Sequence, residues 1–324
     1  MSHAIEASGL TKRYGEKTAL DDFDLEVPRG AVCSLLGPNG AGKTTAVRLL
    51  TTLTEPDAGN ARVAGHDIRT DPVAVRRSIG LAAQDATVDG LLTGYENLVM
   101  LGELHHLGRR RAVERARELL AQFSLADAAD KVVKEYSGGM RRRLDLAATL
   151  VSRPEILFLD EPTTGLDPRA RIELWDVLDE LVAQGSTILL TTQYLEEADR
   201  LADEIVVVDH GRVIARGDAR SLKRDLGATQ LHVVVVGDED VEAVAEIAGR
   251  IAGTAPTVQE RTITAPTDGG AAAVAALAGE LADRGIEVED LGLRQPTLDD
   301  VFLTLTGAPA EPGQPVSEYE EVGR

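Results

Sequence analysis

The chain has 324 residues, 43% of them hydrophobic and only 3% aromatic, so its cores must be built from aliphatic side chains. This length predicts about two domains. The formal net charge of -20 excludes nucleic acid as a main partner, because binding a phosphate backbone needs clustered Lys and Arg. We interpret the acidity, which is concentrated in residues 229–324, as a solvated, solubilising surface.

Cysteine usage and hydropathy bear on the compartment. The single cysteine, Cys33, cannot form an internal disulfide, so a reducing compartment and a buried core thiol are expected. The first six residues lack the charged-then-apolar pattern of a secretion signal. No apolar run reaches the roughly 18 residues that a membrane helix needs. Any role at a membrane is therefore expected to act through a partner.

A phosphate-loop pattern lies near the N-terminus. Its residues are Gly37, Pro38, Asn39, Gly40, Ala41, Gly42, Lys43, Thr44 and Thr45. An apolar run at 31–36 predicts a buried strand before it, and the pattern at 46–50 predicts a helix after it. The glycines let backbone N–H groups turn toward phosphate oxygens, and the helix N-terminus adds further donors. We predict that Lys43 bridges the β- and γ-phosphates of a nucleotide and that the Thr44 hydroxyl ligates Mg²⁺.

The segments around this loop predict an α/β fold made of several subdomains. Strands are expected at 4–10 and around Phe23 to Val27, where apolar residues alternate with acids, giving a partly antiparallel sheet beside a parallel core. Residues 85–152 read as a helical subdomain inserted into that core. Thr93 and Glu96 form a capping-box pattern at its start, and further helices fit 112–123 and 140–151.

Two adjacent carboxylates end a buried strand at 155–160. Because ligands sit at the carboxyl ends of parallel strands, Asp160 is expected to hold Mg²⁺, directly or through water. Glu161 is expected to face the other way and polarise an attacking water. The alternative is an ordinary loop start or helix cap. Asp167 then caps a helix, and a buried strand at 187–192 ends at Gln193.

The last third of the chain has a different character. Strand and helix patterns from 229 to 307 follow the order β-α-β-β-α-β, which predicts a small α+β domain, ferredoxin-like or related. We expect the first domain to span 1–228. The Pro-, Gly- and Glu-rich residues 308–324 predict a disordered acidic tail.

A further motif makes a family resemblance specific. Tyr136, Ser137, Gly138, Gly139, Met140 and Arg141 precede the third helix of the inserted subdomain. They resemble the Leu-Ser-Gly-Gly-Gln signature of ATP-binding cassette (ABC) proteins, from which Tyr136 and Met140 depart. Two glycines and a hydroxyl at a helix N-terminus suit a phosphate group. The resemblance implies a P-loop NTPase fold and a nucleotide-binding domain that hydrolyses ATP with Mg²⁺.

The resemblance also implies roles for other residues. Tyr14 matches the aromatic residue that stacks on adenine, and Gln84 matches the glutamine that touches Mg²⁺ and links to the helical subdomain. Residues 165–167 match the loop that crosses the interface of a head-to-tail homodimer. In such a dimer Ser137, Gly138 and Gly139 would act on the ATP of the partner subunit.

One position departs from the family. Gln193 stands where these proteins usually have a histidine that contacts the γ-phosphate. A glutamine donates a neutral hydrogen bond but cannot become charged or shuttle a proton. We hypothesise that Glu161 remains the general base and that Gln193 only positions the γ-phosphate.

This departure itself resembles a subgroup. The runs Thr-Thr-Gln-Tyr-Leu at 191–195, Tyr-Ser-Gly-Gly-Met-Arg-Arg-Arg at 136–143 and Leu-Asp-Asp-Val-Phe-Leu at 298–303 are similar to daunorubicin/doxorubicin-resistance ATP-binding proteins. The similarity implies an unfused ATPase subunit that drives drug export. It would pair with a separate integral membrane permease and lie on the cytoplasmic side of the cell membrane, bound only through that permease.

Two other readings stay open. One is a regulatory or assembly ATPase that acts on a soluble partner. The other is a slow ATP-binding clamp, an alternative that the glutamine at position 193 supports. The small C-terminal domain either steadies the dimer or docks the permease, and its residues include no catalytic constellation.

Overall fold

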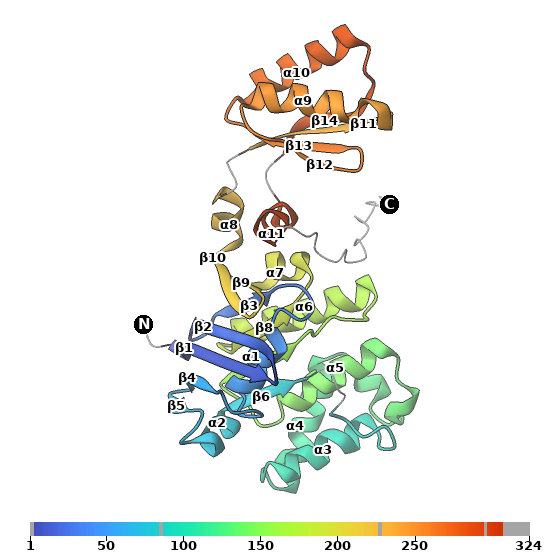
Figure 1. The fold of residues 1–324 in the computed structure, drawn as a ribbon. Helices are drawn as coiled ribbons and strands as arrows, with labels where there is room; N and C mark the ends of the chain where they lie inside the picture. Colours follow the sequence, from blue (N-terminus) through green and yellow to red (C-terminus); the bar gives the residue numbers. More distant parts are fainter. Residues whose placement is uncertain (1–2, 84–86, 226–228, 295–296, 307–324) are drawn as a thin grey trace. The chain divides into compact units, whose positions relative to one another are not determined.

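The computed structural model describes residues 3–83, 87–225, 229–294 and 297–306 (Figure 1). These residues form two compact units, the first reaching to Arg216 and the second beginning at Gly217. The domain limits of 1–228 and 229–307 stay a prediction, and the predicted tail at 308–324 lies outside the described residues. Within the described ranges, no helix is both long and apolar enough to cross a membrane.

A six-stranded sheet forms the centre of the first unit. Its order is β10-β9-β3-β8-β7-β6. The strands are β3 (Val32–Leu36), β6 (Ile79–Ala82), β7 (Ile156–Asp160), β8 (Thr187–Thr192), β9 (Glu204–Asp209) and β10 (Arg212–Gly217). From β9 to β6 all neighbours are parallel. Every residue of β3, β7 and β8 is buried, which fits the mainly apolar sequences of strands that are covered on both faces.

An antiparallel sheet of order β2-β1-β4-β5 belongs to the same unit. Its strands are β1 (His3–Tyr14), β2 (Lys17–Pro28), β4 (Ala58–Val63) and β5 (His66–Asp67). It shares a hydrophobic cluster with helix α1 (Lys43–Leu50) and the central sheet, to which Ile5, Phe23, Leu49 and Phe158 belong. The predicted antiparallel sheet is therefore confirmed, and it covers one face of the parallel core.

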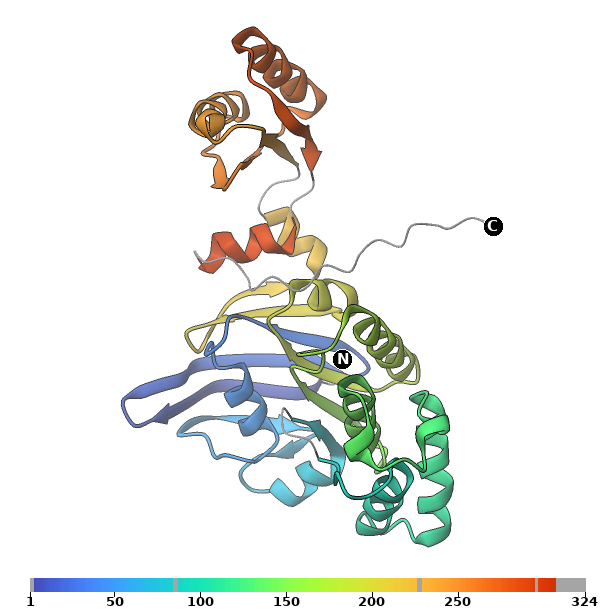
Figure 2. The ribbon, with the colours of Figure 1, turned by 90° about the vertical axis from the view of Figure 1, so that its right-hand side faces the viewer.

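Helices α5 (Gly138–Thr149), α6 (Pro168–Ala183) and α7 (Leu195–Leu201) lie against the opposite face of the central sheet. Helices α3 (Gly94–Leu104) and α4 (Arg109–Gln122) pack on each other and on α5, while α2 (Pro72–Ser78) precedes β6. Figure 2 shows α3, α4 and α5 together at one end of the unit. Short 3₁₀ turns at Ala126–Ala128 and Val133–Glu135 join α4 to α5.

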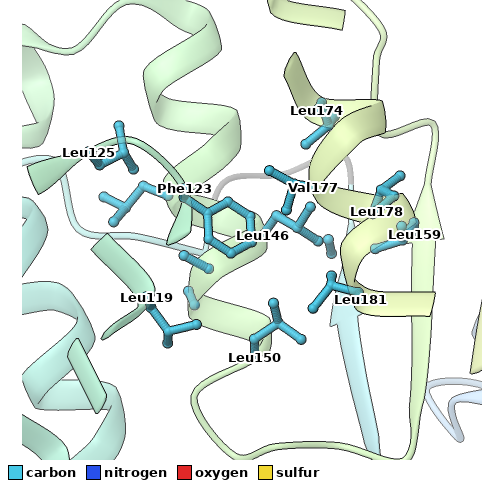
Figure 3. Packing of buried hydrophobic residues seen from close by; sticks show 14 of the residues in the cluster. Leu119, Phe123, Leu125, Leu146, Leu150, Leu159, Leu174, Val177, Leu178 and Leu181 are labelled. Carbon is cyan, nitrogen blue, oxygen red and sulfur yellow. The ribbon is translucent and has the colours of Figure 1, made fainter. Parts of the chain in front are cut away.

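A second hydrophobic cluster attaches these helices to the sheet. Phe123, which follows α4, and Leu146 of α5 pack with Leu174 and Leu178 of α6 (Figure 3). Leu159 of β7 belongs to the same cluster, whereas its neighbour Phe158 belongs to the cluster on the other face. Alternation along one strand thus fills both faces of the central sheet.

The second unit contains a smaller sheet of order β12-β13-β11-β14, antiparallel throughout. Its elements are β11 (Gln230–Val235), α9 (Val241–Ala252), β12 (Thr257–Gln259), β13 (Thr262–Pro266), α10 (Gly270–Arg284) and β14 (Val288–Arg294). A 3₁₀ turn (Asp238–Asp240), α8 (Ala219–Asp225) and α11 (Leu298–Thr306) complete the unit. Leu231, Val233 and Ile263 meet the apolar faces of α9 and α10 in one core. This is the predicted ferredoxin-like arrangement.

Candidate functional site

The predicted phosphate loop connects β3 to α1 in a conformation that requires glycine. Gly40 and Gly42 have φ of 81° and 110°, in the left-handed region. A Cβ at Gly42 would lie 2.5 Å from the Ala19 carbonyl oxygen, and one at Gly37 would lie 2.2 Å from that of Val208. The loop is therefore packed against neighbouring backbone, which leaves no room for a side chain at Gly37 or Gly42, whereas Gly40 is required for its positive φ.

Lys43, the first residue of α1, reaches back across the loop. It is only 4% exposed, and its Nζ donates hydrogen bonds to the carbonyl oxygens of Gly37 at 2.6 Å and Pro38 at 3.1 Å. These contacts fix the ammonium group over the loop, beside the N-terminus of α1. A triphosphate entering here would meet a fixed positive charge together with the helix N-terminus.

A cavity of about 340 Å³ opens over this loop. It is lined by Tyr14, Lys17, Ala19, residues 39–45 and Glu161. Tyr14 lies at the hairpin between β1 and β2, is 47% exposed, and has the Lys12 Nζ 5.6 Å from its ring centroid. The structure thus brings the aromatic residue, the phosphate loop and one carboxylate into one cavity. Lys17 also lines this cavity and was not predicted from the sequence.

A hydroxyl and a carboxylate meet at the floor of the site. Thr44 Oγ1 donates to Asp160 Oδ1 at 3.2 Å, and Thr191 Oγ1 donates to the same oxygen at 2.5 Å. Asp160 is 4% exposed. Such hard oxygen donors are the ligands that Mg²⁺ prefers, so the residues present fit that ion. Gln84, the third predicted ligand, lies outside the described residues.

The adjacent carboxylate, Glu161, has a separate environment. Its φ is +50°, which is unfavourable for a residue with a side chain. Its N–H group is shared between the carbonyl and hydroxyl oxygens of Thr191, each at 3.1 Å. Its Oε2 accepts a hydrogen bond from Thr164 Oγ1 at 3.4 Å. Asp160 therefore contacts Thr44 while Glu161 lines the cavity, and the roles predicted for these two carboxylates stay predictions.

Gln193 lies beside the loop but does not line this cavity. The preceding residue, Thr192, accepts the Gly37 N–H at 3.4 Å and receives the Tyr194 N–H on its hydroxyl at 3.0 Å. The Gln193 Oε1 is buried and has no hydrogen-bond partner among the described residues. Contact between Gln193 and a γ-phosphate stays a prediction.

The signature residues lie apart from the phosphate cavity. Ser137 caps α5, its Oγ accepting the Met140 N–H at 3.2 Å, and Gly138 and Gly139 begin the helix. Gly138 lines a different cavity of about 430 Å³, whose other lining residues are Arg141, Arg142, Asp145, Glu161 and 164–166. Glu161 is the residue that these two cavities share. Ser137, Gly138 and Gly139 therefore do not line the phosphate cavity of their own chain.

The phosphate loop, the two carboxylates at the end of β7 and the Ser-Gly-Gly helix start define an ATPase of the ATP-binding-cassette class. Residues 20–164 match the family model described as ABC transporter. A solved ATP-binding cassette of an ABC transporter, in its ADP conformation, matches with a TM-score of 0.62 at 26% identity. That match covers 68% of this chain and 93% of that chain.

Full-length relatives narrow the class. Daunorubicin resistance ATP-binding protein DrrA2 of Streptomyces coeruleorubidus is 54% identical over 94% of this chain and 95% of that protein. Daunorubicin/doxorubicin resistance ATP-binding protein DrrA of Streptomyces peucetius is 51% identical over 96% of this chain and 94% of that protein. The chain therefore belongs to the daunorubicin/doxorubicin resistance ATP-binding proteins of the ABC transporter family, which confirms the family and fold predicted from sequence.

Proposed function

We propose that this chain is the subunit that hydrolyses ATP to drive export of a drug or antibiotic through a separate membrane permease. The observation that carries this proposal is the single cavity lined by the phosphate loop, Tyr14 and Glu161. The names of the similar proteins support the drug class. The molecule exported would contact the permease, so the cassette residues leave its identity open.

Each residue of the site has a distinct proposed role. Tyr14 stacks on the adenine, and Lys43 with the N–H groups of the loop holds the phosphates. Thr44 and Asp160, together with Gln84, hold Mg²⁺. Bound there, Mg²⁺ supplies positive charge to the β- and γ-phosphate oxygens. Glu161 accepts a proton from the water that attacks the γ-phosphate.

Gln193 is proposed to position the γ-phosphate through its amide. A neutral amide cannot take a proton, so proton transfer is assigned to Glu161 alone. On this assignment Gln193→His leaves hydrolysis dependent on Glu161. A slow ATP-binding clamp is the second candidate function, because Gln193 lies outside the phosphate cavity in this structure.

The proposed assembly contains two copies of this chain and a permease. ATP-binding subunits of ABC exporters generally dimerise and pair with membrane permeases. Ser137, Gly138 and Gly139 of one copy would close over the ATP bound by the other, as their distance from their own cavity favours. Binding to the permease would hold the protein at the cytoplasmic face of the cell membrane.

The test compares ATP turnover of the wild type with that of Glu161→Gln. Removing the general base should lower turnover by about 100-fold or more while ATP still binds. Glu155→Gln is the matched control, because Glu155 directly precedes the opposite end of β7, where it pairs with Arg29. That variant should keep turnover within about twofold. Near-normal turnover of Glu161→Gln contradicts the base assignment, and tight ATP binding without wild-type turnover favours the clamp.

A further inference from the structure

The guanidinium of Arg142 donates hydrogen bonds to four backbone carbonyl groups at the carboxyl ends of β6 and β7. Its Nε donates to Pro162 O at 2.8 Å, and its Nη1 donates to Ala83 O at 2.9 Å. Its Nη2 donates to Asp160 O and Glu161 O, each at 3.0 Å. Carbonyl groups of three consecutive residues therefore converge on one planar cation, whose fork of donors a lysine cannot reproduce.

The turn that Arg142 contacts has a strained backbone at Glu161. Glu161 adopts a positive φ, which persists only where surrounding contacts over-determine it. Thr191 accepts a hydrogen bond from the Glu161 N–H group. Arg142 donates to the carbonyl oxygens of Asp160 and Glu161, which lie on either side of the Glu161 Cα. Without the guanidinium, the backbone at Glu161 could relax toward an ordinary conformation and turn the carboxylate away from the phosphate cavity.

Arg142 belongs to α5, the helix that begins at the Ser-Gly-Gly motif. One turn later the buried Asp145 accepts the N–H groups of Thr87 at 2.8 Å and Val88 at 3.2 Å. Helix α5 is thus tied to the β7 turn through Arg142 and to the chain after β6 through Asp145. A shift of α5 would therefore move the backbone of Glu161 and with it the Glu161 carboxylate.

We propose that Arg142 is a positioning residue for ATP hydrolysis, acting through the backbone of Glu161 and linking the signature helix to the catalytic carboxylate of its own chain. The proposal rests on the proposed function. Arg142 does not line the phosphate cavity, so its effect is expected on the rate of the chemical step and not on ATP binding.

Steady-state kinetics provides the first test. Arg142→Ala should lower kcat by about 10- to 100-fold, since small misplacements of a reacting group have effects of that size, while KM for ATP changes by less than about twofold. Arg142→Lys should recover only part of the rate. The control is Arg143→Ala, because Arg143 is on the same helix and mostly buried but contacts Phe123 O and Glu173. Equal losses in Arg142→Ala and Arg143→Ala would overturn the proposal.

Two further readouts separate positioning from general damage. In a Glu161→Gln background, single-turnover hydrolysis should show little additional loss from Arg142→Ala, because the arginine acts through that carboxylate. A full additional loss would overturn the proposal. Amide hydrogen exchange of residues 158–166 should be faster in Arg142→Ala than in Arg143→Ala, and unchanged exchange would also overturn it. This exchange arm decides the role of Arg142 even if the wild type shows no turnover, a result that would refute only the proposed function.

Discussion

A carboxyl group lies fully buried behind the phosphate site. Glu197 is 0% exposed, and its Oε1 accepts the Trp175 indole N–H at 3.3 Å. Burial raises the pKa of Glu197 above its ordinary value of 4.5, and the hydrogen bond from the Trp175 indole opposes that rise. A raised folded-state pKa stabilises the fold below the unfolded value, and this stabilisation is lost as the pH rises through the folded value.

Replacing Glu197 by its neutral isostere should therefore have a pH-dependent effect. Relative to the wild type, Glu197→Gln should gain free energy of unfolding as the pH rises above 4.5, because the wild type alone must ionise a buried acid. Urea unfolding at several pH values measures this. A difference between the two proteins that is constant with pH would contradict the assignment.

Local sequence patterns revealed some site residues and concealed others. The phosphate loop, Asp160 and Glu161 could be predicted because their chemistry depends on contiguous residues. Arg142 and Thr191 could not, since their importance lies in contacts with residues 18 to 59 positions away in the chain. No pattern along α5 distinguishes Arg142 from its neighbours Arg141 and Arg143.

At the scale of elements, the contacts of Tyr136 explain one departure from the signature pattern, the tyrosine in place of leucine. It is 6% exposed, and its hydroxyl donates to Ala128 O at 2.7 Å. A Cβ at Gly94, the first residue of α3, would lie 2.2 Å from that hydroxyl. A tyrosine fits here only because α3 begins with a glycine. The side chain thereby joins the start of α3 to the turn before α5.

Tyr136→Phe should lower the free energy of unfolding by about 1 kcal/mol, because one buried hydrogen bond is lost and the ring is kept. Chemical denaturation measures the change. Tyr14→Phe is the control, since the exposed Tyr14 should tolerate the same deletion with almost no loss. If the two variants lose equal stability, the Tyr136 hydroxyl does not join these elements.

Element prediction succeeded where the pattern was strong. The Thr93 capping box is present as predicted, with Thr93 Oγ1 accepting the Glu96 N–H at 3.1 Å. The strand β4 was missed, because Ala58–Val63 contains Gly59 and Asn60 and lacks β-branched alternation. It is a strand because it pairs with β1, a contact that no local pattern reports. For the same reason β1 and β2 are longer than expected.

At the scale of the whole molecule, order along the chain was informative. The β-α-β-β-α-β order of the second unit predicted a ferredoxin-like α+β fold, and its sheet order β12-β13-β11-β14 agrees with that fold. The predicted domain limits of 1–228 and 229–307 stay a prediction. The structure separates its units after Arg216, before α8, and no change of composition marks that point.

Two copies of this chain are proposed to close around ATP, each completing the other's site. The most direct measurement is the mass of Glu161→Gln by light scattering, with and without ATP and Mg²⁺. We predict a mass of about two chains with ATP and one without it, since each signature motif lies away from its own phosphate cavity. Adding Lys43→Ala should abolish the change. A single-chain mass in the presence of bound ATP would contradict the claim.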